Sequence, residues 1–418
     1  MKARPVVVIL GAGFAGLQAC EALASAAVEV LVIDRHNYNT FQPLLYQVAT
    51  AGLSPGDIAY PLRSYARRHL HAGFERAVVT GVDFGGRRVI LEDQDPVRYD
   101  YLVVATGAAT NFFGVRGAAE HAHAIYTMED AITVRDLSAE SLEQAAAGRS
   151  GQGGLTIVIV GGGATGVEMA GTLAELRDMR LRTLYPEIDP TVARVVLIEQ
   201  QDRLLSAFDK RLGAYALRVL SRRGVEVRCA TVVSEVTPCE VKLACGEVIS
   251  TSLAIWAAGV GPTPLVRSLG ASDAAVGLER GRLSVGPDLR LEGQEVVFAV
   301  GDVSAARGAG SAQLLAQLAQ PAIQEGRHAA AQIDHLLKGE PTESFVYKDK
   351  GTMATIGRRA AVAELPGGLR LRGTLAWVAW LGLHLVFLLG ARNRVSVVVN
   401  WTWRYLYWRN APKIIAGS

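Results

Sequence analysis

Two stretches of the chain repeat one pattern of apolar and polar positions. Residues 6–10 form a short apolar run, which is followed by closely spaced glycines and by a helical pattern over 17–26. Residues 157–160 and 167–176 repeat this order 150 residues later, again with glycines between the two segments. Short apolar runs that end at glycine are typical of buried parallel strands. The pattern therefore predicts two strand–turn–helix units.

The glycines of both turns have the spacing G-x-G-x-x-G. In a strand–turn–helix context the first glycine makes the tight turn, the second lets the backbone approach a pyrophosphate, and the third lets the helix pack on the strand. The helix N-terminus then offers a positive pole to the phosphates. The matching residues are Gly11, Gly13 and Gly16 in the first unit and Gly161, Gly163 and Gly166 in the second. We expect a dinucleotide at each turn.

Each unit also has an acid at the end of its second predicted strand. Asp34 follows Gly16 by 18 residues, and Glu199 follows Gly166 by 33, a longer spacing that we attribute to an inserted loop at 181–190. An acid at this point can bind ribose hydroxyls, and it would repel the 2′-phosphate of NADPH. We therefore expect NADH at the second turn. The alternative is that either acid is a solvated strand end.

Three later strand ends continue the same plan. Apolar runs at 102–105 and 254–257 end in small residues, and the run at 296–300 leads into Gly301–Asp302, where a carboxylate could reach a polyol chain. In this order the landmarks resemble the flavin disulfide reductase superfamily, which implies FAD in the first site and NAD(P)H in the second. We expect an α/β fold with two Rossmann-like dinucleotide-binding domains.

The composition, and above all the cysteine content, disfavours several activities of this superfamily. The 418 residues are 50% hydrophobic and 20% charged, as in a well-packed protein of more than one domain. The four cysteines form no CxxC pair, and the segment 38–47 contains none. Disulfide reductases, cysteine peroxidases and sulfide oxidases need cysteines beside the flavin, so these activities are disfavoured. The histidines offer no convincing ligand cluster, and we expect no metal.

Four stretches resemble type II NADH dehydrogenases, the single-subunit NADH:quinone oxidoreductases. They are residues 38–55, 161–171, 319–324 with the pattern AQxAxQ, and 347–354. The resemblance extends over essentially the whole chain, including its C-terminal tail. It implies that NADH gives a hydride to FAD and that the flavin passes two electrons to a membrane quinone, without proton pumping.

The resemblance also implies roles for four side chains. Gln320 and Gln324 lie four apart, so they share a helix face, and their amides could hold quinone carbonyls. The alternative is a helix whose glutamines face water. Glu168 is expected in the first helical turn after Gly166, where the helix dipole would stabilise it. The resemblance pairs Glu168 with Lys350 in handling protons.

The cofactor positions follow from the two turns and from the resemblance. For FAD we expect Gly11, Gly13, Phe14, Ala15, Gly16, Asp34, Arg35, Pro43, Thr50, Ala105, Thr106, Gly107, Gly301, Asp302 and Gln320. For NADH we expect Gly161, Gly163, Ala164, Thr165, Gly166, Glu168, Glu199, Ala258 and Gly259.

The C-terminal tail, residues 365–418, differs from the rest of the chain. It holds seven cations, no Asp or Glu, and five of the six tryptophans: Arg370, Arg372, Arg392, Arg394, Arg404, Arg409, Lys413, Trp377, Trp380, Trp401, Trp403 and Trp408. Residues 374–390 are uncharged but short for a membrane span, which needs roughly 20 residues. We expect amphipathic membrane-anchoring helices that lie in the interface rather than a single span, and no nucleic acid.

The expected organisation has four parts. Residues 1–115 and 276–364 form the FAD-binding domain with the quinone-site helix, 116–275 the NADH-binding domain, and 365–418 the anchor. We expect a homodimer on the cytoplasmic face of a bacterial inner membrane, and we leave open whether the quinone is ubiquinone or menaquinone. Two alternatives are a soluble reductase for an iron–sulfur protein and a flavoprotein that senses NADH without turnover.

Overall fold

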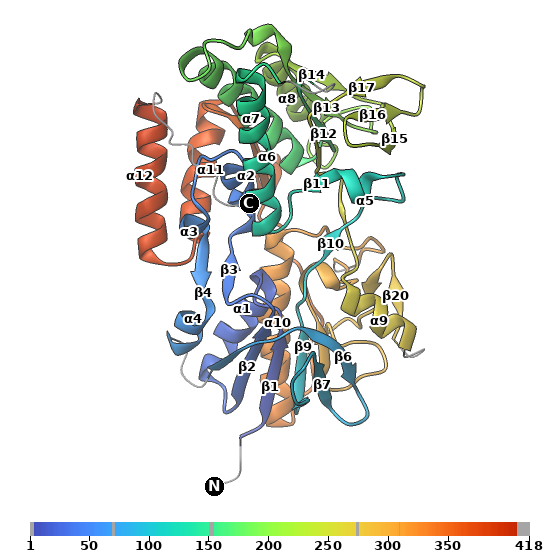
Figure 1. The fold of residues 1–418 in the computed structure, drawn as a ribbon. Coiled ribbons are helices and arrows are strands. Elements are labelled where there is room, and N and C mark those ends of the chain that lie inside the picture. The colour runs from blue at the N-terminus through green and yellow to red at the C-terminus, as the bar shows by residue number, and fades with distance from the viewer. Residues whose placement is uncertain (1–3, 69–71, 150–153, 273–275, 309, 408–418) are drawn as a thin grey trace. The chain divides into compact units, whose positions relative to one another are not determined.

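A computed structural model describes residues 4–68, 72–149, 154–272, 276–308 and 310–407. The chain forms two compact units that alternate along the sequence (Figure 1). Unit 1 comprises Met1–Asn39, Tyr60–Ala109 and Val260–Asp349. Unit 2 comprises Thr40–Ala59, Thr110–Gly259 and Lys350–Ser418. Each unit is built around one parallel sheet.

The sheet of unit 1 has five strands in the order β22-β9-β1-β2-β5. Its strands are β1 (Val6–Leu10), β2 (Glu29–Asp34), β5 (Ala72–Arg76), β9 (Tyr101–Val104) and β22 (Val297–Ala299). Helices α1 (Phe14–Ala22) and α10 (Ala319–Lys338) pack against each other beside it (Figure 1). The other elements are α4 (Leu62–Arg68), β6 (Val79–Asp83), β7 (Arg88–Leu91), β8 (Val97–Arg98), α9 (Pro264–Ser272), β20 (Leu278–Glu279) and β21 (Arg282–Leu283).

The sheet of unit 2 repeats this plan with the order β11-β18-β12-β13-β14. Its strands are β11 (Ala122–Ala124), β12 (Leu155–Val160), β13 (Ala193–Ile198), β14 (Val225–Arg228) and β18 (Leu253–Trp256). The surrounding elements are α5 (Ala118–His121), α6 (Met128–Ala146), α7 (Ala164–Thr183), α8 (Lys210–Arg222), β15 (Val233–Val236), β16 (Glu240–Leu243) and β17 (Val248–Ser250). Short strands β3 (Tyr38–Thr40), β4 (Ala59–Pro61), β10 (Ala109–Thr110) and β19 (Val260–Gly261) lie where the chain changes unit.

The two sheets confirm the predicted duplication. β1 pairs in parallel with β2 and β9, and β12 pairs in parallel with β13 and β18, so the repeated segments have equivalent places. The helix boundaries differ from expectation. α1 ends at Ala22 and continues as a 3₁₀ turn over Leu23–Ser25, while α7 continues to Thr183, so the predicted loop at 181–190 begins as helix. A long α7 therefore accounts for part of the wider spacing to Glu199.

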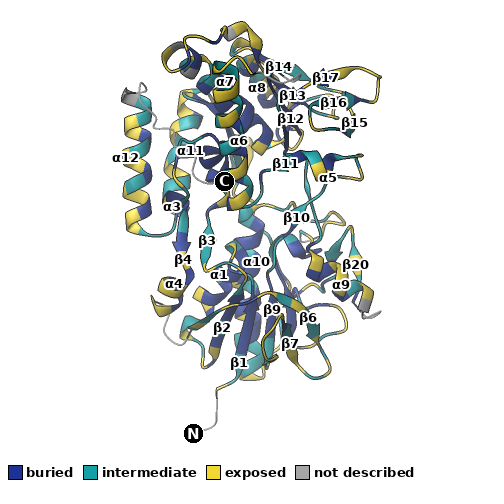
Figure 2. Ribbon diagram, viewed as in Figure 1, coloured by how far each residue is buried: buried dark blue, intermediate teal, exposed yellow. Residues whose placement is uncertain are grey.

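The last part of unit 2 carries the C-terminal helices. β23 (Thr352–Gly357), β24 (Ala360–Glu364) and β25 (Arg370–Arg372) form an antiparallel sheet, against which α11 (Thr374–Phe387) packs. α12 (Ala391–Tyr407) packs on α3 (Pro55–Ile58), and the short helix α2 (Leu45–Ala49) lies against α6 and α7. Trp408, Arg409 and Lys413 lie outside the described residues. Figure 2 shows many exposed positions along α11 and α12.

Candidate functional site

The first turn has no room for a side chain at Gly11 or Gly16, whereas the space next to Gly13 is open. A side chain at Gly11, whose φ is +96°, would place a Cβ 2.4 Å from the Ala105 carbonyl oxygen. At Gly16 a Cβ would lie 1.9 Å from the Gly11 carbonyl oxygen. A Cβ at Gly13 meets nothing within 4 Å. The first and third glycines therefore allow the fold, and the second borders open space at the N-terminus of α1.

The second turn has the same construction. A Cβ at Gly161 would lie 2.6 Å from the Ala257 carbonyl oxygen, and one at Gly166 would lie 1.8 Å from the Gly161 carbonyl oxygen. A Cβ at Gly163 again meets nothing within 4 Å. Both turns thus expose one glycine at a helix N-terminus, where a pyrophosphate can approach the backbone. Ala164 and Thr165 form the start of α7.

The two predicted acids, Asp34 and Glu199, accept equivalent backbone hydrogen bonds from their glycine turns. Asp34 accepts the Ala12 N–H at 2.7 Å and the His36 N–H at 2.8 Å. Glu199 accepts the Gly162 N–H at 2.6 Å and the Gln201 N–H at 2.7 Å. Each carboxylate therefore lies directly beside its glycine turn. That is where the ribose of a dinucleotide on the turn would lie.

Further polar atoms in unit 1 point to a bound group. Within the described residues, the Thr106 hydroxyl and the Gln320 side-chain carbonyl oxygen are buried and have no hydrogen-bond partner. A buried polar atom is normally satisfied, so an unpartnered one calls for an explanation, of which a ligand is one. Gly301 and Asp302 form a short turn directly after the sheet. The residues of unit 1 therefore fit a flavin dinucleotide.

Other predicted FAD residues are placed differently. Arg35 is exposed, and its side chain donates to the His36 ring. Pro43 and Thr50 belong to unit 2, and the buried Thr50 hydroxyl donates to the carbonyl oxygen of Tyr46 at 2.8 Å. The Thr50 hydroxyl therefore closes the end of α2.

Gln320 and Gln324 have distinct surroundings although they are four residues apart on α10. Gln324 donates its amide N–H to the Lys348 carbonyl oxygen at 2.9 Å and accepts the Lys348 N–H at 3.0 Å. This pair of bonds ties α10 to the segment before β23 and occupies both ends of the amide. The Gln320 carbonyl oxygen is the one of the two that is unpartnered within the described residues.

Glu168 is a buried acid in the second turn of α7, not in the first turn as expected. Its carboxylate accepts the Thr355 N–H of β23 at 3.2 Å. Burial raises the pKa of Glu168 to about 8, and the Thr355 N–H and the Trp380 side chain oppose this rise. Burial is therefore the largest influence on the pKa of this acid, and its stabilisation by the helix dipole stays a prediction. Lys350 is exposed and lies just before β23.

A hydrogen-bonded chain of side chains next to Glu168 was missed by the sequence reasoning. The Trp401 indole N–H donates to the side-chain oxygen of Gln47 at 2.8 Å, and the side-chain amide N–H of Gln47 donates to the Tyr46 hydroxyl at 2.8 Å. All three side chains are buried. Burial and the charge of Glu168 raise the pKa of Tyr46. This series of hydrogen bonds thus runs from Trp401 of α12 to Tyr46 of α2, whose pKa responds to the charge of Glu168.

Aromatic rings enclose the same region. Trp380 stacks on His384 with centroids 3.9 Å apart and meets the Tyr46 ring edge-on at 6.2 Å. Burial lowers the pKa of His384 to about 4, so its ring is neutral near pH 7. A polar residue inside an apolar run indicates a buried polar contact, but the sequence does not indicate which distant residue is the partner. The contact between Gln47 and Trp401 could therefore not be predicted.

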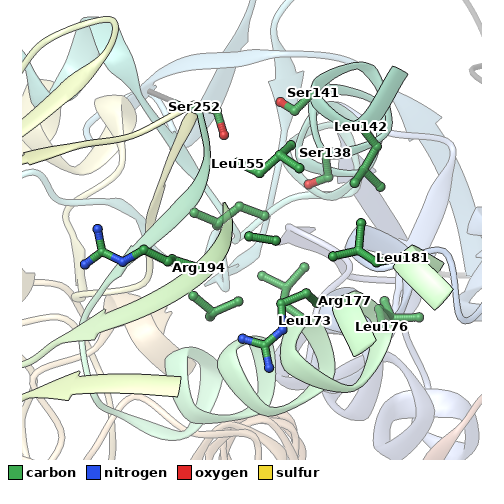
Figure 3. Close-up of a pocket in the computed structure, with 13 residues that line it drawn as sticks. Ser138, Ser141, Leu142, Leu155, Leu173, Leu176, Arg177, Leu181, Arg194 and Ser252 are labelled. Carbon is green, nitrogen blue, oxygen red and sulfur yellow. The ribbon is translucent and has the colours of Figure 1, made fainter. Parts of the chain in front are cut away.

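A small cavity in unit 2 is separate from the second glycine turn. It has a volume of about 50 Å³ and is lined by residues of α6, α7, β12 and β13, among them Leu142, Leu173 and Leu181, which Figure 3 labels. Leu155 and Ala193, which begin β12 and β13, line it together with Ser252. Ligands of doubly wound sheets bind at the carboxyl ends of the strands. The cavity is therefore at the wrong end of the sheet to hold NADH.

Neither a metal-binding cluster nor a membrane-spanning helix is found among the described residues. Among them, no group of three or more His, Cys, Asp or Glu residues is arranged to hold a metal ion. None of the described helices combines the length and the apolar character needed to cross a bilayer.

Sequence families match almost the whole chain. Residues 5–326 match the family of pyridine nucleotide-disulphide oxidoreductases, and residues 350–410 match the NDH2 C-terminal domain. The fold and the paired glycine turns are thus those of a pyridine nucleotide-disulphide oxidoreductase.

Individual relatives define the family within this class. The chain is 38% identical to the type II NADH:quinone oxidoreductase Ndh of Mycobacterium tuberculosis over 99% of this chain and 90% of that protein. It is 31% identical to the Staphylococcus aureus type II NADH:quinone oxidoreductase over 87% of this chain and 90% of that one. The chain belongs to the type II NADH:quinone oxidoreductase family.

A solved structure supports the fold. NDH2 of Plasmodium falciparum, solved in complex with NADH, superposes with a TM-score of 0.90 at 20% identity, covering 98% of this chain and all of that one.

Proposed function

We propose that this chain oxidises NADH and reduces a membrane quinone, with tightly bound FAD as the carrier between the two half-reactions. The observation that carries the proposal is the duplicated turn, in which Gly13 and Gly163 each border open space at a helix N-terminus. When bound, FAD supplies the chemistry that accepts a hydride and passes two electrons onward. The protein binds the flavin and the two substrates, orients them and shields the flavin from water.

The FAD would be held by residues of unit 1. The Gly13 backbone and the α1 N-terminus would bind the pyrophosphate, and Asp34 the ribose. Asp302 lies in the turn that follows β22, and its carboxylate would bind the ribityl hydroxyls. The unpartnered oxygens of Thr106 and Gln320 are further contacts for the cofactor or for the quinone.

The NADH would be held by the second turn of unit 2. Its pyrophosphate would bind the Gly163 backbone at the start of α7, and Glu199 would accept hydrogen bonds from the ribose. Because Glu199 is a carboxylate, it repels a 2′-phosphate and favours NADH over NADPH. Ala258 and Gly259 follow β18 at the carboxyl edge of the same sheet.

Glu168 is suited to supply protons. With a pKa near 8 it carries its proton at neutral pH, and a raised pKa close to the working pH favours proton transfer. Quinone reduction consumes two protons, which must come through the protein or from water. Lys350 is exposed just before the strand whose Thr355 N–H binds Glu168, and we assign it to proton handling together with Glu168.

The C-terminal helices would attach the protein to lipid. Apolar side chains are exposed at the following positions of α11 and α12: Leu375, Val378, Leu383, Val386, Val395, Val398, Val399 and Trp403. Interfacial helices bury such residues at the boundary of the acyl chains, while cations bind anionic headgroups. We infer monotopic attachment to the cytoplasmic face of the inner membrane as a homodimer. A soluble reductase or an NADH sensor would not need this surface.

Replacing Glu168 by Gln tests the proposed role of the acid. The variant keeps the size and the acceptor but cannot give a proton, so quinone reduction should slow by about 10²-fold or more. Stopped-flow absorbance should show that flavin bleaching by NADH is preserved and that recovery with quinone is slow. The exposed Glu340→Gln variant is the matched control. Wild-type rates in Glu168→Gln would rule the role out.

A further inference from the structure

The turn that carries Asp302 is held by a buried acid of α10. Glu325 is 2% exposed, and its carboxylate accepts the Gly301 N–H at 2.7 Å. Gly301 has a φ of +78°, so the backbone bends sharply there and directs its N–H towards α10. None of the roles assigned above uses Glu325.

The same turn is held from its other side. The Gln317 amide donates to the Asp302 carbonyl oxygen at 2.9 Å, and Arg282 donates to the Gln317 side chain at 2.9 Å. Arg282 also donates to the Leu315 carbonyl oxygen at 2.7 Å. The backbone of the turn is therefore fixed by two hydrogen bonds, one from the Gly301 N–H to Glu325 and one from the Gln317 side chain to the Asp302 carbonyl oxygen.

The position of Glu325 is itself fixed by close helix packing. At the next residue, Gly326, a Cβ would lie 2.2 Å from the Ala15 carbonyl oxygen, so α10 touches the backbone of α1. A Cβ at Gly301 would lie 3.1 Å from the Ala15 Cβ. The helix that begins at the first glycine turn, the Asp302 turn and Glu325 thus form one packed assembly within unit 1. A shift of Glu325 would move the turn.

Burial is the main reason why Glu325 favours its neutral form near pH 7. Burial, together with the charge of Asp302, raises the pKa of Glu325 to about 8, while the Gly301 N–H and Arg282 lower it. Asp302 and Arg282 are the charged groups that face it, and Arg282 in turn faces Glu279 and Arg280. Ionisation of Glu325 would therefore place a second negative charge beside Asp302 in a buried site.

We propose that Glu325 is a positioning residue for FAD, which acts by holding the Gly301–Asp302 turn in the geometry that binds the cofactor. The inference rests on the proposed function, in which Asp302 binds the ribityl chain. As a neutral acid, Glu325 accepts the Gly301 N–H through its carbonyl oxygen and adds no charge. As a carboxylate, it repels Asp302, so the turn is held less well and retention of the cofactor weakens as the pH rises.

The test measures FAD release from the purified holoenzyme. The protein is diluted at pH values from 6 to 9.5, and the fluorescence of liberated FAD gives the dissociation rate. We expect the wild-type rate to rise on the order of tenfold between pH 7 and pH 9, as expected for a new like-charge contact in a partly buried site. Glu325→Gln keeps the acceptor but cannot ionise, so its rate should be independent of pH.

Two further variants separate positioning from a general loss of structure. Glu325→Ala removes the acceptor and should release FAD faster at every pH, whereas the exposed Glu340→Gln should behave as wild type. Equal pH profiles for wild type and Glu325→Gln would overturn the inference, as would unchanged retention in Glu325→Ala. If the wild type is yellow and is bleached by NADH, those results refute the role of Glu325 alone. A wild type without flavin refutes the proposed function as well.

Discussion

Replacing Glu168 by Gln should change how the stability of the protein depends on pH. The pKa of this acid is about 8 in the folded protein, against an ordinary value of 4.5. Each pKa unit is worth about 1.4 kcal/mol, so the full shift corresponds to about 5 kcal/mol of unfolding free energy. Gln cannot titrate. The difference between the two proteins therefore isolates this single group from every other acid.

The sign follows from where the proton is bound. Below pH 4.5 the carboxyl is neutral in the folded and the unfolded chain, and its contribution to stability is fully present. Between pH 4.5 and pH 8 the unfolded chain ionises while the folded protein keeps the proton, so stability falls as pH rises. Above pH 8 the loss levels off. Relative to Glu168→Gln, wild type should lose about 3 kcal/mol between pH 4.5 and pH 7.

Urea unfolding followed by circular dichroism measures this difference. Midpoints are compared at pH steps from 5 to 8.5, with the slope m checked for constancy. Glu340→Gln, an exposed acid-to-amide change, should follow the wild-type curve. A wild-type stability that differs from that of Glu168→Gln by the same amount at every pH would show that the folded protein does not hold this acid protonated.

The remaining predictions concern the nucleotide turn and the membrane surface. Gly163→Ala adds a Cβ in open space, so the fold should survive while the Kd for NADH, measured by calorimetry, rises at least about tenfold; an unchanged Kd would contradict the placement. Gly166→Ala would bring a Cβ within 1.8 Å of a carbonyl oxygen and should lower the yield of folded protein, so normal yield and stability would contradict this packing. Val386→Asp with Val395→Asp should reduce flotation with anionic vesicles roughly tenfold or more, whereas Val248→Asp should not; equal flotation of all three proteins would argue against attachment through α11 and α12.

The duplicated core could be predicted from sequence because parallel strands leave an unbroken apolar signal. β1 and β12 are almost entirely buried, so their sequences are nearly continuous apolar runs, and a glycine follows each of them. The apolar run of β13, residues 195–198, ends instead at Glu199. The two turns could also be predicted, because their geometry leaves no room for a Cβ at Gly16 or Gly166 and so requires glycine in the sequence. The predicted division into four domains stays a prediction.

The surroundings of the candidate site could not be predicted in the same way. Sequence spacing places Gln320 and Gln324 on one helix, but only the fold shows that the Gln324 amide is occupied by the Lys348 backbone. The dipole argument for Glu168 did not consider burial, which raises the pKa, or the opposing contacts with Thr355 of β23 and Trp380 of α11. Such neighbours are distant along the chain and leave no local pattern.

The C-terminal helices show why composition alone is insufficient. α11 is apolar on nearly all sides, so hydrophobic periodicity does not mark the face that packs on the protein. In the structure Trp380 and Trp401 are buried, whereas Trp403 is 55% exposed. The tryptophans that looked like one membrane-interface group therefore divide into side chains of the protein interior and a side chain of the surface.

The absorbance spectrum of the detergent-purified protein during anaerobic titration tests whether the two turns seat a flavin and a nicotinamide nucleotide. We predict a yellow protein whose flavin absorbance is bleached by one equivalent of NADH and restored by one equivalent of a quinone. A colourless protein that stays colourless after incubation with FAD would contradict the account, as would a flavin that NADH reduces but no quinone reoxidises.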